Sequence, residues 1–223
     1  MIIKAGTLSG WFNYIRDLND SYEPDNLGRF TESFWESQLA SKEVVLRLLP
    51  KGFPLVNVHI FGGWFGILGQ LILDSYDGSY NRNERSLPHI YTCDIDPKCE
   101  AVINQFFHNP NITAITGDMQ DYKYDRHTLY AGYTPHTLVD VVINCSTEHV
   151  TQEVYDAWFD NIPADTYYII QGNNLDIPEH CRLSKDMEEF EKMNRCEGVV
   201  ERVTTDCPGP DGMFQRFTIA AVK

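Results

Sequence analysis

One short stretch of the sequence combines an acid, an imidazole and hydroxyl groups. It lies at the end of a largely apolar run that begins at residue 139, and it consists of Asn144, Cys145, Ser146, Thr147, Glu148 and His149. An imidazole can act as a general base near neutral pH, so His149 is a candidate base, with Glu148 orienting it or a substrate. We therefore predict catalytic roles for Asn144, Glu148 and His149, and a substrate contact for Ser146.

The same stretch also has a purely structural interpretation. Ser146 or Thr147 can cap a following helix, with Glu148 completing the capping interaction. Cys145 is a weaker candidate nucleophile, because no partner motif accompanies it and buried cysteines are usually inert. Both interpretations place a buried strand before the stretch and a helix after it.

A glycine-rich turn is the second stretch that could take part in chemistry. Residues 56–61 are mostly apolar, Gly62, Gly63 and Gly66 follow, and apolar residues then recur at helical spacing. Glycine lets a ligand approach the backbone closely at such a strand-to-helix turn. The spacing differs from the dinucleotide fingerprint G-x-G-x-x-G, and Trp64 stands where a middle glycine is expected. The pattern predicts a nucleotide-binding turn of unusual form.

Alternating strand and helix patterns supply the framework for these residues. Strands are predicted near 56–61, 89–93, 112–116, 139–144, 166–171, 199–204 and 214–222. Helices are predicted near 8–20, 30–49, 97–107, 154–163 and 184–196, and another is predicted to begin at residue 67. Loops are predicted at 22–28 and 77–86, and a loop or short helical turn is predicted within 118–137. This order predicts an α/β fold, a Rossmann-like, mainly parallel seven-stranded sheet with an antiparallel C-terminal hairpin strand, preceded by N-terminal helices.

Polar residues follow several of the predicted strands, at positions that line the ligand crevice of open α/β sheets. They include Asp94 after the second strand, Asp118 after the third, and Gln171 and Asn173 in the region of the fifth. A carboxylate such as Asp94 can accept both neighbouring hydroxyls of a ribose, and the two amides can bind a polar substrate. Alternatively, Asp94 stabilises a helix N-terminus by about 0.3–1 kcal/mol, while Asp118 and Asn173 are ordinary turn residues.

In the order of these motifs, residues 55–223 resemble the class I S-adenosylmethionine-dependent methyltransferases. In that family the glycine turn contacts the methionyl part of the cofactor, an acid after the second strand holds the ribose, and an acid after the third meets the adenine. The cofactor-binding residues that the resemblance implies are Gly62, Gly63, Gly66, Asp94, Ile95, Asp118 and Met119. The chain departs from the family in having no acid near the end of its first strand and in having Trp64 in place of a glycine.

The N-terminal helices are predicted to form a part of their own. We expect a helical extension or lid over residues 1–52 and an S-adenosylmethionine-binding Rossmann-like domain over 53–223. Gln38 and Lys42 lie one helical turn apart and are predicted to contact the substrate from such a lid. The alternative is a helix packed on the sheet with a solvated polar face.

Composition limits the classes of partner. The chain has 223 residues and a formal net charge of −14, which opposes broad attraction to nucleic acid or anionic membranes. We expect a small-molecule substrate, and no membrane span because the most apolar window is interrupted by polar residues and glycines. The six cysteines include no C-x-x-C pair, so we expect reduced thiols, a cytoplasmic location and no metal site. The oligomeric state is not indicated.

These features together predict a soluble enzyme that transfers the methyl group of S-adenosylmethionine to a small polar acceptor. Two alternatives stay open: another S-adenosylmethionine enzyme, such as an aminocarboxypropyl transferase, and a non-catalytic binding or assembly protein on the same fold. A dinucleotide oxidoreductase is less favoured, because its fingerprint is absent from the sequence.

Overall fold

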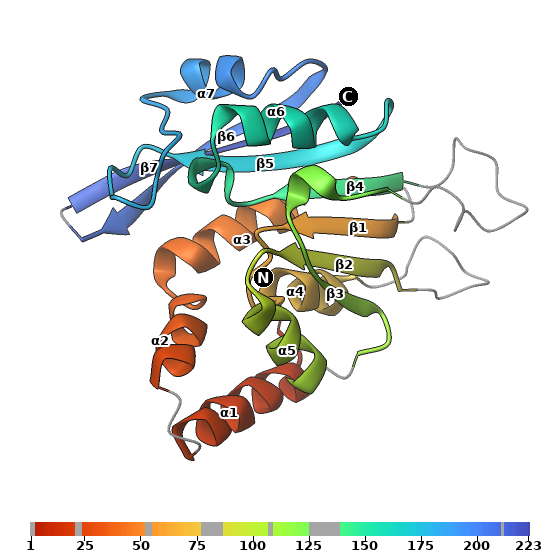
Figure 1. The fold of residues 1–223 in the computed structure, drawn as a ribbon, viewed down its shortest axis with the longest axis vertical. Coiled ribbons are helices and arrows are strands. Elements are labelled where there is room, and N and C mark those ends of the chain that lie inside the picture. Colours follow the sequence, from red (N-terminus) through yellow and green to blue (C-terminus); the bar gives the residue numbers. More distant parts are fainter. Residues whose placement is uncertain are drawn as a thin grey trace, which may run out of the picture.

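The computed structural model describes residues 3–20, 24–51, 55–76, 87–106, 109–124, 139–210 and 212–223. Within them, seven strands form one sheet in the order β3-β2-β1-β4-β5-β7-β6 (Figure 1). The strands are β1 (Leu55–Phe61), β2 (His89–Asp94), β3 (Ile112–Thr116), β4 (Val139–Asn144), β5 (Tyr167–Asn173), β6 (Val199–Gly209) and β7 (Gly212–Val222). β7 is antiparallel to β5 and β6, and the other neighbours are parallel. The predicted Rossmann-like α/β fold is therefore confirmed.

Branched apolar residues place the central strands in the interior. Val58 of β1, Ile143 of β4 and Ile169 of β5 are each 0% exposed, as expected for strands covered by helices on both faces. Parallel pairing brings Phe61 of β1 level with Asn144 of β4. The carboxyl ends of neighbouring strands therefore lie together at one edge of the sheet.

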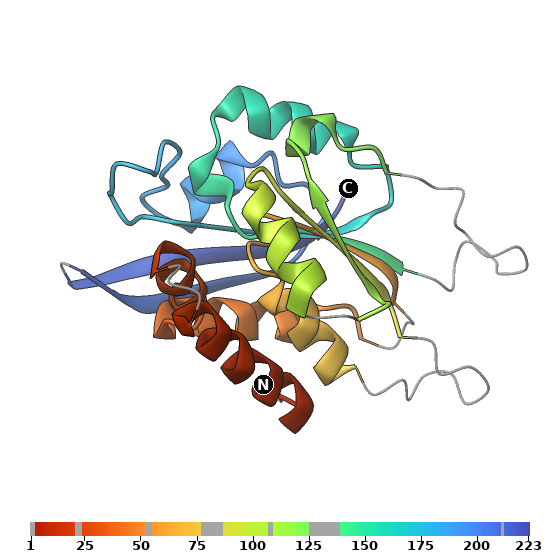
Figure 2. The same cartoon turned by 60° about the horizontal axis from the view of Figure 1, so that its bottom comes forward.

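Helices cover both faces of the sheet. They are α1 (Ala5–Asp20), α2 (Pro24–Glu32), α3 (Glu36–Leu48), α4 (Ile67–Ser75), α5 (Pro97–Phe106), α6 (Gln152–Asn161) and α7 (Met187–Met193). One face packs against α3 and α4 through a cluster that includes Val45 and Leu68. The other packs against α6 and α7 through Trp158 and Phe190. Figure 2 shows α6 on one side of the sheet and α1 and α4 on the other.

The N-terminal helices depart from the predicted bounds. The sequence pattern predicts a loop at 22–28 and one helix near 30–49, but α2 already begins at Pro24 and is separated from α3. Between them, Trp35 has φ −56° and ψ 149° and no side-chain cap. The break is needed because the two helices pack on different partners: Phe30 of α2 contacts Tyr14 of α1, whereas Val45 of α3 enters the sheet core.

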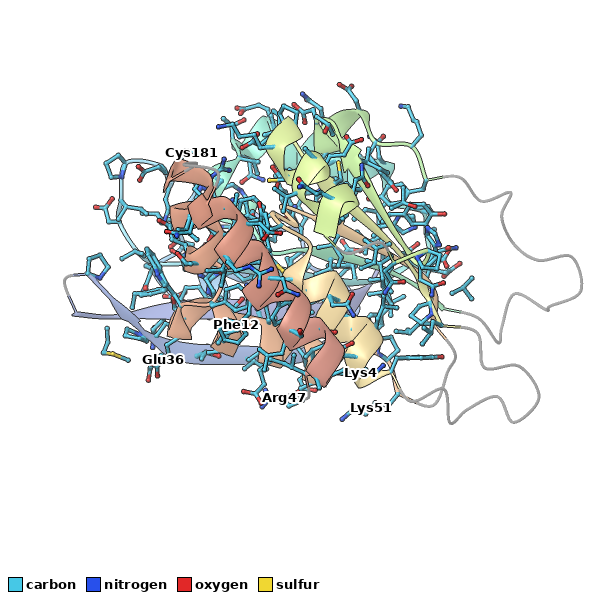
Figure 3. The ribbon with its side chains drawn as sticks, turned by 90° about the horizontal axis from the view of Figure 1, so that it is seen from below. Lys4, Phe12, Glu36, Arg47, Lys51 and Cys181 are labelled. Atoms are coloured by element: carbon cyan, nitrogen blue, oxygen red, sulfur yellow. The ribbon has the colours of Figure 1, made fainter. Side chains whose placement is uncertain are left out.

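Hydrogen bonds attach the start of α1 to α4. The backbone N–H of Lys4 donates to Oδ2 of Asp74 at 2.9 Å, and the Thr7 hydroxyl donates to Oδ1 at 3.2 Å. Asp74 is buried in α4, and the Gln70 amide donates to its Oδ1 as well. Figure 3 shows Lys4 at the end of α1 that lies beside α4. The division into an extension over 1–52 and a domain over 53–223 stays a prediction.

The C-terminal hairpin is longer than predicted. Its strands reach Gly209 and resume at Gly212, because Cys207 pairs with Phe214 and both side chains are buried. The helix predicted near 184–196 is in turn shorter. α7 starts after Asp186, whose carboxylate caps it by accepting a hydrogen bond from the backbone N–H of Glu189 at 2.9 Å.

Two predicted loops can be compared with the structure only in part. The predicted loop at 77–86 lies entirely outside the described residues. Residues 125–137 of the second loop lie outside them as well. Within the described part of that second loop, a 3₁₀ turn, η1 (Met119–Asp121), is present as one of the two expected forms. Of the helices in the described segments, none is both long enough and apolar enough to cross a membrane.

Candidate functional site

A cavity of about 530 Å³ opens at the edge of the sheet where β1, β2, β3 and β4 end. α3 lies beside the same edge (Figure 1) and contributes to the wall. The predicted site residues that line the cavity are Gln38, Lys42, Gly62, Gly63, Asp94, Ile95, Asp118, Met119, Asn144, Ser146, Glu148 and His149. Gly66, Gln171 and Asn173 are the predicted site residues that lie outside this lining. The structure thus brings together predicted site residues from five separate segments of the sequence.

Backbone geometry and packing both require glycine in the turn after β1. Gly62 has a φ of 60° and Gly66 a φ of 73°, in the left-handed region that favours glycine. A Cβ atom on Gly62 would overlap the Ser146 side chain, and one on Gly63 would overlap Thr92. Gly66 occupies the N-cap position of α4, so its conformation sets the start of that helix. The glycines therefore allow the turn to lie directly against β2 and the segment after β4.

The Asp94 carboxylate joins the end of β2 to this turn. Its Oδ2 accepts a hydrogen bond from the backbone N–H of Trp64 at 3.0 Å, and its Oδ1 accepts one from the N–H of Asp96 at 3.1 Å. Trp64 has a φ of 50°, which is uncommon for a residue other than glycine. Each carboxylate oxygen has a second lone pair, so Asp94 can also accept hydrogen bonds from a ligand in the cavity.

An ion pair links α2 to the same corner of the site. Arg29 lies 2.5 Å from Oδ2 of Asp96, and its guanidinium lies 5.6 Å from the centre of the Phe65 ring. Burial opposes the ionisation of Asp96, but hydrogen bonds from the Lys98 backbone and from Arg29 outweigh it and lower the pKa of this carboxyl. Arg29 thereby balances the negative charge of Asp96, which lies two residues after Asp94.

Asp118 lines the cavity and also holds a local turn. Its Oδ1 accepts a hydrogen bond from the Gln120 backbone at 3.1 Å, and its Oδ2 accepts one from the Gln120 side chain at 3.0 Å. The Asn144 amide lies 3.4 Å from the sulfur of Met119. The turn-forming role considered for Asp118 is therefore present, and it leaves lone pairs on both oxygens for a ligand.

Glu148 is a buried acid, with 3% of its surface exposed. It lies in the 3₁₀ turn η3 (Thr147–His149). Its Oε1 accepts a hydrogen bond of 2.5 Å from the Asn173 amide and lies 3.7 Å from Nη1 of Arg216. Its Oε2 has no hydrogen-bond partner among the described residues. A buried carboxylate held on one side and open on the other is suited to bind a ligand.

The capping interpretation of this stretch does not hold. Thr151, not Ser146 or Thr147, caps α6, because its side chain accepts a hydrogen bond from the backbone N–H of Val154. Ser146 makes no side-chain cap, and the Thr147 hydroxyl instead donates to the carbonyl oxygen of Gln171 at 2.7 Å. These polar residues therefore face the sheet and the cavity rather than a helix end.

Gln171 joins α3 to the sheet. It is 0% exposed, its Oε1 accepts a hydrogen bond of 2.6 Å from the Ser41 hydroxyl, and its Nε2 donates to Oγ1 of Thr218 at 2.9 Å. Asn173 supports Glu148, as described above, and its Oδ1 accepts a hydrogen bond from the Leu175 backbone at 2.9 Å. Both amides that were predicted to bind substrate therefore already have partners within the protein.

The inner wall of the cavity carries two cations. The Lys42 ammonium lies 3.3 Å from Oε1 of Gln38, and burial lowers the pKa of Lys42 to about 8 against the opposing effect of Cys145. Lys42 is half-buried and lines the cavity. The second cation is Arg216, which is 5% exposed and whose Nε has no hydrogen-bond partner among the described residues. The buried Ser33 hydroxyl also lacks a hydrogen-bond partner among these residues.

Sequence reasoning missed Ser33 and Arg216 as lining residues of the cavity. Arg216 had a recognisable signal, since it is the one charge within the largely apolar run 214–222. Ser33 had no such signal, because its position depends on the break between α2 and α3. His149 is placed at the exposed side of the site, with Nδ1 3.2 Å from the carbonyl oxygen of Glu179.

No protein-family model and no curated protein sequence matches this chain. Solved structures do resemble it. The N-methyltransferase NodS from Bradyrhizobium japonicum, in complex with S-adenosylhomocysteine, is 9% identical with a TM-score of 0.56, over 85% of this chain and 89% of that one.

Two further structures have similar scores. Phosphoethanolamine N-methyltransferase 2 from Haemonchus contortus, in complex with S-adenosylmethionine, is 12% identical with a TM-score of 0.60, over 94% of this chain and 60% of that one. The magnesium protoporphyrin IX methyltransferase ChlM from Synechocystis is 16% identical with a TM-score of 0.52, over 82% and 79%. The chain therefore has the Rossmann-like fold of the class I S-adenosylmethionine-dependent methyltransferases.

Proposed function

We propose that the protein is a cytoplasmic S-adenosylmethionine-dependent methyltransferase that acts on a small polar molecule. The observation that supports this most directly is the contact between the Asp94 carboxylate and the backbone of Trp64 beside the cavity. It sets a carboxylate next to a glycine turn, the pair of features that holds the nucleoside and methionyl parts of a cofactor at the carboxyl edge of an α/β sheet. The fold similarity to methyltransferases adds support.

The residues present fit a nucleoside cofactor. A cavity of about 530 Å³ lies within the usual size range of small-molecule sites, and it contains polar atoms without protein partners. We assign the ribose to Asp94, with Ile95 beside it, and the adenine to Asp118 and Met119. The backbone of Gly62 and Gly63 would contact the methionyl part. When bound, S-adenosylmethionine supplies an electrophilic methyl carbon.

The protein would act on the acceptor chiefly by positioning it. Alignment of a nucleophile with the methyl carbon lowers the barrier, and a base is needed only where the nucleophile carries a proton. We assign the positioning of the acceptor to Asn144, Ser146 and Glu148, and proton removal to Glu148 or His149. Gln38 and Lys42, on α3, would contact the acceptor from the opposite wall.

Calorimetric titration tests the cofactor assignment. We expect the purified protein to have one site per chain that binds either S-adenosylmethionine or S-adenosylhomocysteine, with the two ligands competing for it. Absence of binding by both would overturn the proposal. Incubating metabolite extract with methyl-labelled S-adenosylmethionine would then identify the acceptor as the labelled product. Release of methylthioadenosine instead of S-adenosylhomocysteine would show an aminocarboxypropyl transferase.

A further inference from the structure

Two histidines and a glutamate from separate segments meet beside the cavity. Glu148 and His149 follow β4, and His180 belongs to the segment after β5. One potential ligand atom from each of the three residues lies within 4.8 Å of the other two. We propose that these side chains bind a divalent transition-metal ion, although the sequence alone led us to expect no metal site.

Hydrogen bonds set the tautomer of both imidazole rings. His149 Nδ1 lies 3.2 Å from the carbonyl oxygen of Glu179, and His180 Nδ1 lies 2.7 Å from that of Leu175. A carbonyl oxygen only accepts, so each Nδ1 carries the hydrogen, and each Nε2 keeps its lone pair. Metal-binding histidines are oriented in this way, with the second nitrogen donating to a carbonyl or carboxylate. Both rings are therefore prepared to bind a cation through Nε2.

The third side chain provides a buried oxygen that needs a partner. Oε1 of Glu148 is held by Asn173 at 2.5 Å, whereas Oε2 has no hydrogen-bond partner among the residues described. Leaving a buried carboxylate oxygen unsatisfied is costly, and a bound cation would satisfy it. The guanidinium of Arg216 lies 3.7 Å from Oε1. The fixed oxygen thus faces the protein, and the free one is available to a metal.

The ligand types indicate the class of metal. Imidazole nitrogens favour first-row transition metals such as Co²⁺ and Zn²⁺, whereas Mg²⁺ and Ca²⁺ prefer all-oxygen sites. Three protein ligands leave at least one coordination position open, as in catalytic rather than structural sites. Glu148 and His149 line the cavity, so an open position would lie next to the space for the acceptor.

The consequence for catalysis rests on the proposed function. A cation at an acceptor hydroxyl would hold its oxygen in place and favour loss of the hydroxyl proton to solvent water, which leaves a better oxygen nucleophile near neutral pH. His149 would then act as a metal ligand instead of a general base. The cation site itself depends only on the three side chains and stands whether or not a methyl group is transferred.

Binding of the metal alone provides the test. Protein freed of metal with a chelator would be titrated with CoCl₂, followed by visible absorption, and with ZnCl₂, followed by calorimetry. We expect one ion per chain, and at least about tenfold weaker binding in His149→Ala and in His180→Ala, since even loss of outer-shell partners weakens metal sites by that much. Neither residue is fully buried, so both variants should fold. The matched control is His89→Ala, a half-buried histidine of β2, which should bind as the unaltered protein does.

Three results would overturn the proposal. The first is the absence of saturable binding of either metal, and the second is unchanged affinity in both histidine variants. Cys181, labelled in Figure 3, is an exposed thiol next to His180, so loss of binding in Cys181→Ser alone would also refute the proposed ligand set. Titration of the metal-free protein with S-adenosylmethionine tests the proposed function separately, because cofactor binding and metal binding are measured independently.

Discussion

The Asn173 amide donates a 2.5 Å hydrogen bond to Oε1 of Glu148, and both side chains are almost completely buried. Asn173 is the last residue of β5, and Glu148 follows β4, so the contact fixes the ends of two adjacent strands relative to each other. A residue outside the cavity lining thereby sets the position of a carboxylate inside it.

Replacing Asn173 with alanine should destabilise the protein. Oε1 of Glu148 would lose its hydrogen bond, and a buried charged group that loses its donor costs about 1–3 kcal/mol. Urea denaturation would measure the change in unfolding free energy. Asn161→Ala is the control, because Asn161 is exposed and its amide donates a hydrogen bond to the carbonyl oxygen of Gln120. Equal losses in the two variants would contradict the importance assigned to the Glu148 contact.

Replacing Asp94 with asparagine should weaken binding of S-adenosylmethionine by about 10- to 100-fold. Hydrogen bonds to charged groups contribute about 1.5–3 kcal/mol, and each 1.4 kcal/mol corresponds to a factor of ten in affinity. Calorimetry would measure the dissociation constant. Asp121→Asn provides a matched control, since Asp121 is exposed at the end of η1 and lies outside the cavity lining. The ribose assignment would be wrong if both variants retained full affinity.

Replacing Gly62 with alanine should lower stability by about 1–3 kcal/mol, from left-handed backbone strain and overlap with Ser146. Thermal unfolding would detect the loss. Gly117→Ala is the comparison, because a Cβ atom there would meet nothing within 4 Å. Adding Ser146→Gly to Gly62→Ala should recover the part of the loss that overlap causes. No recovery would assign the whole effect to the backbone.

Replacing Lys42 with methionine should give a pH-dependent gain in stability. Burial lowers the folded-state pKa of Lys42 from 10.5 to about 8, so its charge opposes folding fully below the folded pKa. Between about pH 8 and pH 10.5, Lys42 binds more protons in the unfolded chain than in the folded protein. The stability of the wild-type protein therefore increases as the pH rises through this range. The difference, variant minus wild type, should therefore be larger at about pH 7 than at about pH 10 in urea denaturation. A pH-independent difference would contradict the lowered pKa.

The sheet could be predicted from the sequence because its information is local. The largely apolar run that begins at residue 139 and the glycine turn after residue 61 each define a strand end without reference to distant residues. The break at Trp35 could not be predicted in this way. It depends on Phe30 and Val45 finding different tertiary partners, which helical periodicity does not distinguish.

The cavity lining could be predicted mainly where residues follow strands, with Gln38 and Lys42 of α3 as the exceptions. Asp94, Asp118 and Glu148 line the cavity because parallel strands end at a common edge. The roles of Gln171 and Arg216 depend on which side chains from other elements face them, and spacing in the sequence carries no information on that. Whether the lining residues perform their assigned roles stays a prediction.

Insertion of β7 between β5 and β6 also affects when the protein becomes able to bind a ligand. Arg216 on β7 and Lys42 on α3 line the same cavity, although most of the sequence separates them. A chain still emerging from the ribosome therefore has an incomplete cavity until β7 has been made and has paired with both neighbours. Before β7 has paired, a ligand has no complete cavity to bind. Its stabilising effect on the protein therefore begins only after β7 has joined the sheet.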